Sequence, residues 1–558
     1  MSATHNQALI SVDSKLVEEN TRAGHWRTET LADTIRLHAA KNPQGLAFRE
    51  GAHELTWALY DELSDRLAGD LIAAGLPRGS RIAIMLPDGP GVHVAFTACE
   101  KAGLVIVGIG ARAGDREIEH LLRKCQATAL MTESVHAGRP MHELAALMRA
   151  NGLPVAAHII VDRMGRGPGH AGRPGGQLDR PEGDGGRPLD EIAKRRLGPN
   201  DLWLLNSTSG TTGLPKCVMQ FQNRWWYFHQ LALDTGALSA DDRFLSLIPA
   251  PFGFSLWTTH FSPCFLGAPT TVVSRFSADE TLDIIEQQRP TVIACVSTQF
   301  IMLLNAQAQK KRDLSSLRVM FTGGEAVPYE RAAEFEQETG ARVLQFYGSN
   351  ETGALSRTTM RDPREKRLTT CGKIIEGLQV RLLDDDGKPV PPGQPGQPAC
   401  KGPVTCMGYY DDVAANAELV TADGWMKTGD IATIDAEGYL TLAGRKTDFI
   451  IRGGKNISAV AVEEAVATHP MVAMAAAIAM PDKVFGERVC CYVVLRPGGA
   501  LTIPQLAEHL AGRGISKENF PERLVFLDAM PMSPIGKIAK AELRDDIRPR
   551  LAREQAAG

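Results

Sequence analysis

Apolar and polar positions alternate in two patterns along most of the chain. Short apolar runs at 81–87 (RIAIMLP) and 127–134 (ATALMTES) predict strands, and helical periodicity at 30–43 and 93–103 predicts helices. Strands that alternate with helices are typical of strand–helix–strand units around parallel sheets. The pattern therefore predicts an α/β fold class for the first half of the sequence.

The same alternation continues after residue 200. Between two of the predicted strands, the segment 277–290 begins with Ser277 and Glu280 in the spacing of a capping box and ends at Pro290, which predicts a crossover helix. Further buried strands are predicted at 201–206, 243–249, 270–275, 291–296, 318–324 and 342–348. We expect parallel-type αβ sheets in this region as well.

The pattern changes beyond residue 371. Turns such as DDDG (384–387) and DAEG (435–438) separate short strands, which predicts an antiparallel subdomain or a small β-barrel. From residue 446 a second α/β pattern follows, with helices at 459–470 and 503–512 and strands at 474–480, 488–497 and 523–528. We expect a large N-terminal domain at 1–445 and a small, mobile α+β domain at 446–558, joined by a hinge in 444–450.

Composition limits the classes of partner. The chain has 558 residues, 44% of them hydrophobic, which is enough for at least two cored domains. The segment at about 164–187 is rich in glycine and proline, which predicts a long mobile surface loop. The less favoured alternative is that the arginines of this segment bind a phosphate. A net charge of −4 gives no electrostatic case for nucleic acid or an anionic membrane, so a small molecule is the expected partner.

Two further features bear on compartment and metals. The first twenty residues carry charges and lack an apolar segment, and no later stretch reaches membrane-spanning length without charge, so we expect a cytoplasmic protein. The ten cysteines include no C-x-x-C pair, which argues against a zinc site or a disulfide framework.

The segment STSGTTGLPK (207–216) follows a predicted strand and has the chemistry of a phosphate cradle. Glycines uncover backbone N–H groups, hydroxyls add donors, and a lysine adds a cation. The residues concerned are Ser207, Thr208, Ser209, Gly210, Thr211, Thr212, Gly213 and Lys216. The segment does not fit G-x-x-x-x-G-K-[ST], which disfavours kinase-like phosphoryl transfer. Taken alone, it is also compatible with a polar turn after a strand.

Five further segments appear in a fixed order: FTGGEAV (321–327), YGSNETG (347–353), KTGD (427–430), GRKTDFIIRGGKNIS (444–458) and PMSPIGKIAK (531–540). Together with 207–216 they resemble the motifs of the adenylate-forming superfamily, which contains acyl-CoA synthetases, adenylation domains of peptide synthetases and firefly luciferases. The resemblance covers nearly the whole chain. It implies that a carboxylate attacks the α-phosphate of ATP to give acyl-AMP and pyrophosphate, and that a thiol then takes the acyl group.

The resemblance also implies roles for individual residues. Lys216 and the loop before it hold the β- and γ-phosphates, Glu351 holds Mg²⁺ between phosphate oxygens, and Lys537 bridges the carboxylate and the α-phosphate as the catalytic lysine. The nucleoside is expected to contact Gly323, Gly324, Glu325, Ala326, Tyr347, Gly348, Asn350, Asp430 and Arg445. Tyr347 would stack on adenine and Asp430 would accept from the ribose hydroxyls.

Two positions depart from the common pattern of the nucleotide motifs. Asn350 replaces a threonine, and its amide is expected to donate to a phosphate instead. Thr447 replaces an aspartate or lysine at the hinge position, so the neighbouring Lys446 could share the motion.

A third departure concerns the acyl pocket. Phe252 and Gly253 replace the histidine and the following asparagine of hydroxybenzoate-activating relatives, which disfavours an aryl hydroxy-acid. Gly253 suggests extra room, so an alicyclic or medium-chain apolar acid is expected. Candidate lining residues are Trp225, Phe252, Gly253, Phe254, Trp257 and Gly348, with Trp226 and 297–304 nearby; plain core packing is the alternative for the tryptophans of 225–226.

The sequence also bears on which thiol accepts the acyl group. The segments 24–36 and 520–531 look most like ligases of medium-chain and cyclohexanecarboxylate-type acids, and Gly453 and Gly454, with 482–489, resemble the coenzyme A tunnel of such ligases. We expect no carrier domain after residue 558, so free coenzyme A is the simplest acceptor. An enzyme that loads a separate acyl carrier protein and a nucleotide-binding protein without catalysis are the alternatives. A homodimer is common among relatives.

Overall fold

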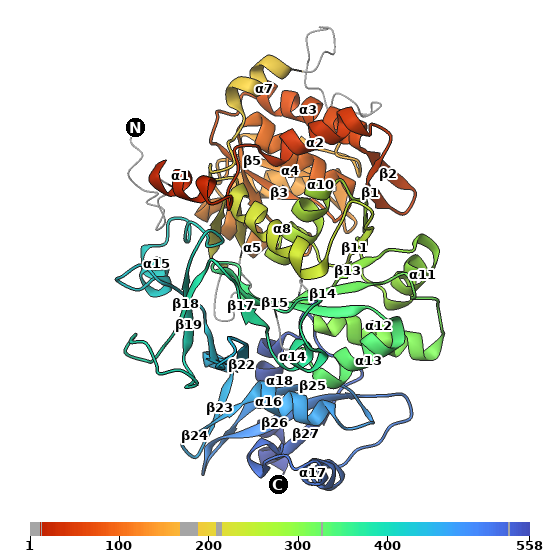
Figure 1. Ribbon diagram of the computed structural model, residues 1–558, viewed down its shortest axis with the longest axis vertical. Coiled ribbons are helices and arrows are strands. Elements are labelled where there is room, and N and C mark those ends of the chain that lie inside the picture. Colours follow the sequence, from red (N-terminus) through yellow and green to blue (C-terminus); the bar gives the residue numbers. More distant parts are fainter. Residues whose placement is uncertain are drawn as a thin grey trace.

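The computed structural model describes residues 12, 14–167, 188–207, 215–324, 327–533 and 536–557. The chain forms a large N-terminal part and a small C-terminal α+β domain, which is blue in Figure 1. The expected α/β class is confirmed, since parallel strands form the centre of both large sheets. Most of the predicted loop at 164–187 lies outside the described residues.

The smaller of the two large sheets carries the strand that leads into the predicted phosphate loop. Its neighbouring strands are parallel except for the antiparallel pair β9 and β10. In spatial order the strands are β10 (Cys217–Gln220), β9 (Leu204–Ser207), β4 (Val105–Gly108), β3 (Arg81–Met85), β5 (Ala129–Thr132) and β8 (Ala157–Ile160). The predicted strands at 81–87, 127–134 and 201–206 are therefore confirmed.

The larger sheet carries the glycine-rich and tyrosine-containing motifs. It is parallel from β15 to β1 and gains antiparallel strands at both edges. Its order is β17 (Lys373–Ile374), β16 (Gly353–Arg357), β15 (Arg342–Ser349), β14 (Val319–Gly323), β13 (Val292–Ala294), β11 (Phe244–Ser246), β12 (Thr270–Val272), β1 (Leu46–Glu50) and β2 (His53–Thr56). Because β14 and β15 are adjacent and parallel, Gly323 and Phe346 lie side by side.

Helices connect and cover these sheets. The predicted crossover helix is α11 (Ala278–Gln288), and the Ser277 hydroxyl accepts from the Glu280 amide at its start. The others are α1 (Ser14–Arg22), α2 (Leu31–Lys41), α3 (Trp57–Ala73), α4 (Pro90–Ala102), α5 (Asp115–Lys124), α6 (Met141–Ala150), α7 (Leu189–Arg195), α8 (Gln222–Gly236), α9 (Gly253–Ser255), the π-helix η1 (Leu256–Phe261), α10 (Ser262–Leu266), α12 (Ser297–Gln309), α13 (Tyr329–Thr339), α14 (Arg364–Thr369) and α15 (Val413–Leu419). A hairpin joins β6 (Val135–His136) and β7 (Arg139–Pro140).

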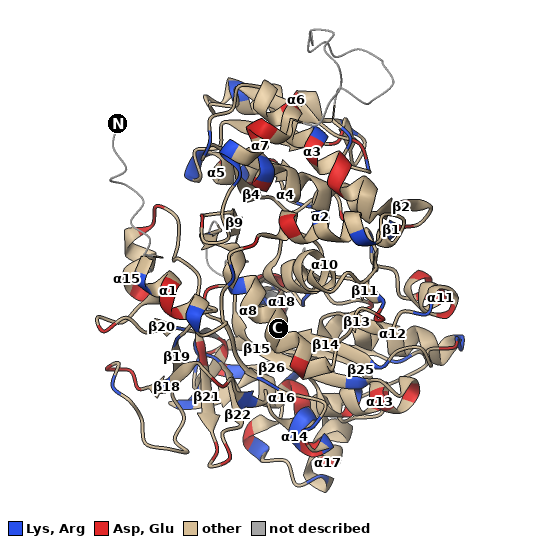
Figure 2. Cartoon of the chain, turned by 45° about the horizontal axis from the view of Figure 1, so that its top comes forward, with Lys and Arg blue, Asp and Glu red and all other residues tan. Residues whose placement is uncertain are grey.

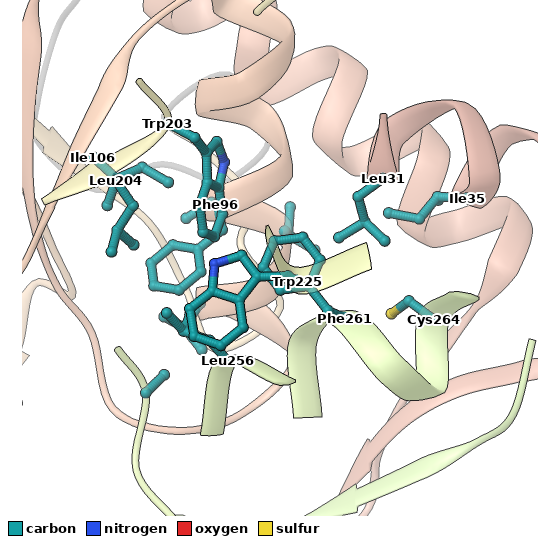
Figure 3. Close-up of a cluster of buried hydrophobic side chains, with 14 of the residues drawn as sticks. Leu31, Ile35, Phe96, Ile106, Trp203, Leu204, Trp225, Leu256, Phe261 and Cys264 are labelled. Carbon is teal, nitrogen blue, oxygen red and sulfur yellow. The ribbon is translucent and has the colours of Figure 1, made fainter. Parts of the chain in front are cut away.

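A core of rings and aliphatic side chains lies where helices of the two large sheets meet. Figure 3 shows Trp225 from α8 and Phe261 from η1 beside Phe96 from α4 and Trp203. The rings of Trp225 and Phe261 stack with centroids 5.8 Å apart. This packing fixes α8 and η1, and therefore the segment before η1 that contains Phe252, Gly253 and Phe254.

The region after residue 371 is antiparallel, as expected, but forms two small sheets. One contains β18 (Gln379–Leu383), β19 (Gln397–Lys401) and β20 (Met426–Lys427), and the other contains β21 (Asp430–Ile434) and β22 (Leu440–Arg445). A bridge between Gly396 and Ala432 joins them. The register of β21 and β22 places Asp430 opposite Arg445.

The C-terminal domain has the predicted alternation of strands and helices. Its strands are β23 (Phe449–Arg452), β24 (Lys455–Ser458), β25 (Val472–Asp482), β26 (Gly486–Leu495) and β27 (Arg523–Phe526), and its helices are α16 (Ala459–Ala467), α17 (Ile503–Gly512), η3 (Lys517–Asn519) and α18 (Lys540–Ala557). Met474 of β25 packs against the core that contains α12, which seats this domain on the N-terminal part.

The folded chain shows neither a surface of one charge in the view of Figure 2 nor, among the described residues, a helix that could cross a membrane. In the view of Figure 2, basic and acidic residues are interspersed over the helices and loops. Among the described residues, no helix combines the length and the apolar character that crossing a membrane requires.

Candidate active site

The phosphate end of the candidate site lies at β9 and β10. Ser207 is the buried last residue of β9, and Lys216 is half-buried immediately before β10. The Lys216 ammonium lies 5.0 Å from the centroid of the Tyr409 ring, within the range of a cation–π contact. The predicted contacts Thr208, Ser209, Gly210, Thr211, Thr212 and Gly213 lie outside the described residues.

Glu351 contacts the same tyrosine as this lysine. The Tyr409 hydroxyl donates to Glu351 Oε1 at 2.7 Å, and burial raises the pKa of the Tyr409 phenol well above its ordinary value. Sequence reasoning missed Tyr409. Its signal was faint, because GYY at 408–410 has no periodicity that separates a site residue from a core residue.

The donor set at Glu351 fits a Mg²⁺ ion. Magnesium prefers hard oxygen ligands, and it is usually held by one or two carboxylates together with substrate phosphates and water. Glu351 supplies one half-buried carboxylate, and it contacts the same tyrosine as the lysine of the phosphate segment. When bound, the ion would neutralise phosphate charge and stabilise the leaving pyrophosphate.

Asn350 takes part in a cluster of side-chain amides. Its Nδ2 donates to Asn206 Oδ1 at 3.0 Å, and its Oδ1 accepts from Asn206 Nδ2 at 3.0 Å and from Gln220 Nε2 at 3.1 Å. Asn206 and Gln220 are buried, so their side-chain amides need such partners. An amide nitrogen carries two N–H groups, so the expected donation of Asn350 to a phosphate stays a prediction.

Arg224 ties this cluster to the turn that carries Glu351. Its Nη1 donates to the Asn350 carbonyl at 3.0 Å and to Gln220 Oε1, and its Nε donates to the Val404 carbonyl at 2.9 Å. Burial lowers the pKa of Arg224 to about 10, so the guanidinium stays charged at neutral pH. These bonds link the backbone of the turn that carries Glu351 to α8 and to the Val404 carbonyl.

At the nucleoside end, Tyr347 and Asp430 form a direct pair. The Tyr347 hydroxyl donates to Asp430 Oδ2 at 2.8 Å, and Arg445 Nε lies 3.8 Å from Asp430 Oδ1. Burial raises the pKa of the Asp430 carboxyl from its ordinary value, and the Tyr347 hydroxyl, Arg445 and Lys537 oppose that shift. The stacking of Tyr347 on adenine and the ribose contact of Asp430 stay predictions.

The glycines of the two central motifs allow close approaches between strands. A side chain at Gly348 would place its Cβ 1.8 Å from the Gly353 carbonyl, and one at Gly323 would lie 2.5 Å from the Phe346 carbonyl. Gly324 has φ +82°, a conformation that favours glycine. Glu325 and Ala326 lie outside the described residues.

The C-terminal lysine reaches this glycine pair. Lys537 Nζ donates to the Gly324 carbonyl at 2.6 Å, and the hydroxyl of Thr298 on α12 donates to the Gly536 carbonyl. The structure therefore brings Lys537 to Gly324, which lies more than two hundred positions earlier in the sequence, and close to Asp430, which the Tyr347 hydroxyl contacts. It is the arrangement that carboxylate activation requires if Lys537 has the predicted role.

Aromatic rings cluster around Trp257, one of the residues predicted to line the acyl site. Trp257 is central, with ring centroids 4.9 Å from Phe228 and 5.1 Å from Phe346. Phe321 and the half-buried Phe254 complete this aromatic floor, at 5.1 and 5.6 Å from Trp257. Truncating a buried ring to alanine typically costs about 3–5 kcal/mol, so the floor is a stable part of the core.

The room inferred from Gly253 is already occupied. A Cβ at Gly253 would lie 2.7 Å from Asn350 Oδ1 and 3.6 Å from Trp225 Cη2. Gly253 therefore permits the amide cluster to approach α9 and does not enlarge the pocket. Trp225 contributes one ring edge here while its face packs in the core, and Trp226 packs against Phe265 with Arg27 over its ring.

The predicted hinge and coenzyme A residues lie in the C-terminal domain and its connection. Thr447 lies in the short 3₁₀ turn η2 (Lys446–Asp448), and its side chain lies outside the described part. Lys446 Nζ lies 2.6 Å from Asp385 Oδ1. Gly453 and Gly454 form the turn between β23 and β24 with φ +58° and +83°, and the Gly453 amide donates to the Phe485 carbonyl at 2.8 Å.

Comparison with known proteins gives consistent family matches. The family described as AMP-binding enzyme matches residues 35–410, and that described as AMP-binding enzyme C-terminal domain matches residues 461–537. The chain is 31% identical to the medium-chain fatty-acid–CoA ligase of Escherichia coli (strain K12), covering 95% of this chain and 93% of that one. It is 30% identical to triostin synthetase I of Streptomyces triostinicus, covering 95% and 96%.

A solved structure, the anthranilate CoA ligase AuaEII in complex with anthranoyl-AMP, superimposes with a TM-score of 0.81 at 23% identity and covers 94% of this chain and 98% of that one. This similarity supports the fold. The family matches extend over both parts of the chain and include the segments that carry Lys216, Glu351 and Lys537. The chain therefore belongs to the AMP-binding, adenylate-forming family, and it is an ATP-binding enzyme that activates an acid.

Proposed function

We propose that the protein is an ATP-dependent carboxylic acid–CoA ligase. In the first step a carboxylate oxygen attacks the α-phosphorus of ATP, and the bond to the bridging oxygen of pyrophosphate breaks. In the second step the sulfur of coenzyme A attacks the acyl carbon of acyl-AMP, loses its proton, and expels AMP. The products are a thioester, AMP and pyrophosphate.

The contact of Lys537 with Gly324 carries this proposal. The Lys537 ammonium lies at the end of β14, close enough to Asp430 to affect the pKa of that carboxyl. Asp430 and Arg445 would bind the ribose and Lys216 the departing phosphates, which leaves Lys537 beside the reacting α-phosphate. A cation fixed there would stabilise the charge that gathers as the carboxylate attacks.

The acid is proposed to be apolar, alicyclic or of medium chain length. A tail that lay against the aromatic floor of Phe228, Phe254, Trp257, Phe321 and Phe346 would meet apolar rings, so a polar tail would lose its hydration without new partners. The relative named as a medium-chain fatty-acid–CoA ligase supports the chain length. Gly253 gives no support, since its neighbourhood is filled.

Free coenzyme A is the proposed acceptor. The support is the name of the same relative, together with the glycine turn at Gly453 and Gly454. The alternative is an enzyme that transfers the acyl group to the thiol of a separate carrier protein. The name of the second relative, triostin synthetase I, specifies no coenzyme A acceptor, so this alternative needs its own test.

The test is a carboxylate-dependent exchange of labelled pyrophosphate into ATP, screened over fatty, alicyclic and aromatic acids. The best acid is then incubated with ATP and coenzyme A, and AMP and acyl-CoA are measured. Exchange with acyl-CoA formation supports the ligase. Exchange without acyl-CoA, together with loading of an acyl carrier protein, supports the alternative, and no exchange with any acid contradicts catalysis altogether.

A further inference from the structure

Tyr409 lies between the two charged side chains expected at the phosphate groups of ATP. Its hydroxyl donates to Glu351 Oε1 at 2.7 Å, and the Lys216 ammonium lies 5.0 Å from its ring centroid. The ring is buried, whereas Lys216 and Glu351 are half-buried. One side chain therefore contacts both a carboxylate and an ammonium through two different surfaces.

The backbone holds Tyr409 in a fixed place relative to Lys216. The segment around it runs beside β10, with Met219 N donating to the Gly408 carbonyl at 2.8 Å and Tyr410 N donating to the Cys217 carbonyl at 2.8 Å. The Asn416 side chain also binds both backbone groups of Tyr409, at 2.7 and 2.9 Å. Since β10 begins directly after Lys216, the tyrosine and the lysine are anchored to one structural unit.

The same segment is also tied to the turn that carries Glu351. The Cys406 amide donates to the Glu351 carbonyl at 2.8 Å, and the Glu351 amide donates to the Ser349 hydroxyl at 3.2 Å. Backbone contacts thus hold the main chain of Glu351, while the Tyr409 hydroxyl orients its carboxylate. A glutamate side chain has several rotatable bonds, so a fixed donor at one oxygen restricts where the other can point.

We propose that Tyr409 is a positioning residue that aligns the Glu351 carboxylate and the Lys216 ammonium for Mg²⁺-bound ATP. The hydroxyl orients the carboxylate toward the cation, and the ring face attracts the ammonium of the phosphate segment. The two functions reside in different atoms and can be removed separately. This inference rests on one part of the proposed function, namely that Glu351 and Lys216 bind Mg²⁺ and the phosphates of ATP.

The experiment measures ATP binding by isothermal titration calorimetry, with and without Mg²⁺, in the absence of acid and coenzyme A. Tyr409→Phe removes the hydroxyl and keeps the ring, and Tyr409→Leu removes both. We expect Tyr409→Phe to weaken Mg²⁺-dependent binding by about tenfold, as a lost hydrogen bond to a charged group does, with little change when Mg²⁺ is absent. Tyr409→Leu should additionally weaken binding without Mg²⁺ by about two- to fivefold.

Tyr439→Phe is a matched control. The Tyr439 hydroxyl donates to Asp362 at 2.7 Å and lysines lie over its ring, so the variant removes the same kind of contact away from the proposed site. It should bind ATP and MgATP as the wild type does.

Equal Mg²⁺ dependence in Tyr409→Phe and wild type would overturn the proposal, as would an equal loss in Tyr439→Phe. A wild type that does not bind MgATP would overturn it too. Thermal unfolding reports whether Tyr409→Leu is folded, and if it is not, Tyr409→Phe decides the outcome. The binding experiment contains neither acid nor coenzyme A. Its result therefore does not depend on whether the exchange assay supports the ligase proposal.

Discussion

The Lys537 ammonium donates to the Gly324 carbonyl at 2.6 Å, a contact between the C-terminal domain and the end of a central strand of the N-terminal part. The residue before Lys537 also contacts α12, where the Thr298 hydroxyl donates to the Gly536 carbonyl. The two parts of the chain are thus placed with the lysine in the candidate site. The small domain is predicted to rotate between the two half-reactions, and this placement would suit the first of them.

The first prediction concerns Lys537→Ala. Loss of a preorganised cation should lower adenylate formation by roughly 10²–10³-fold, because the charge that gathers in the transition state loses its counter-ion. Formation of the thioester from supplied acyl-AMP should be spared. Pyrophosphate exchange measures the first step, and coenzyme A consumption with synthetic acyl-AMP measures the second.

Lys517→Ala is the control for this experiment, since Lys517 is an exposed lysine in the short η3 turn of the same domain. It should leave both steps unchanged. An equal loss of both half-reactions in Lys537→Ala would show that the lysine acts on folding or on a shared step.

The element order and the fold class could be predicted from the sequence because their signals are local. The Ser277 cap and the apolar runs of β11, β13, β14 and β15 each depend on neighbouring residues, and the structure confirms them. The association of Lys216, Glu351 and Tyr409 could not be predicted in this way. It depends on the pairing of 406–410 with β10, which joins residues about two hundred positions apart.

The role of Gly253 also could not be predicted from the local sequence. Its small size suggested room for the substrate, yet the space belongs to Asn350 and Trp225, which come from a distant strand end and from α8. A glycine can serve a ligand or the approach of another side chain, and local sequence does not distinguish the two. Likewise, the partners of Asn350 are Asn206 and Gln220, and nothing in the motif around Asn350 indicates them.

The second prediction concerns an ion pair between the two parts of the chain. Arg513 Nη2 lies 2.8 Å from Glu330 Oε1, and both side chains are nearly half exposed. Such pairs contribute at most about 1 kcal/mol, so Arg513→Glu should slow pyrophosphate exchange by no more than about fivefold at low salt. At about 1 M salt, where the screening length is roughly 3 Å, the difference should disappear.

The double variant Arg513→Glu, Glu330→Arg restores opposite charges and should recover the wild-type rate. A slower double variant at low salt would contradict an electrostatic role for the pair. Thioester formation from acyl-AMP serves as the internal reference, because it is predicted not to need Lys537 in this place.

The third prediction concerns the amide cluster. Asn350→Ala leaves Asn206 and Gln220 without a shared partner, and an unsatisfied buried polar group costs about 1–3 kcal/mol. The free energy of unfolding should fall by about that amount. Chemical denaturation measures it, and Asn151→Ala, which removes an exposed amide contact to Glu119, should change it by less than about 0.5 kcal/mol. Equal effects of the two substitutions would mean that the cluster adds no stability.

The fourth prediction uses the buried carboxyl of Asp88. Its Oδ1 accepts from the Ala250 amide at 2.5 Å, just before the segment with Phe252, and burial raises the pKa of Asp88 to about 8. Glu50 raises this pKa further, whereas the Ala250 amide, Arg112 and Arg163 lower it. Between about pH 4 and pH 8 the folded state therefore keeps a proton that the unfolded state has released.

The sign of the effect follows from this difference in bound protons. Over that window the stability of the wild type should fall as pH rises, by at most about 1.4 kcal/mol per pH unit from this group, and the fall should end near pH 8. Asp88→Asn cannot ionise, and its amide oxygen can still accept from Ala250. The variant should therefore gain stability relative to wild type from pH 5 to pH 8, measured as the difference in the free energy of unfolding in urea. Other titrating groups are common to both proteins and cancel in that difference, so parallel pH profiles would show that Asp88 ionises at an ordinary pKa in the folded state.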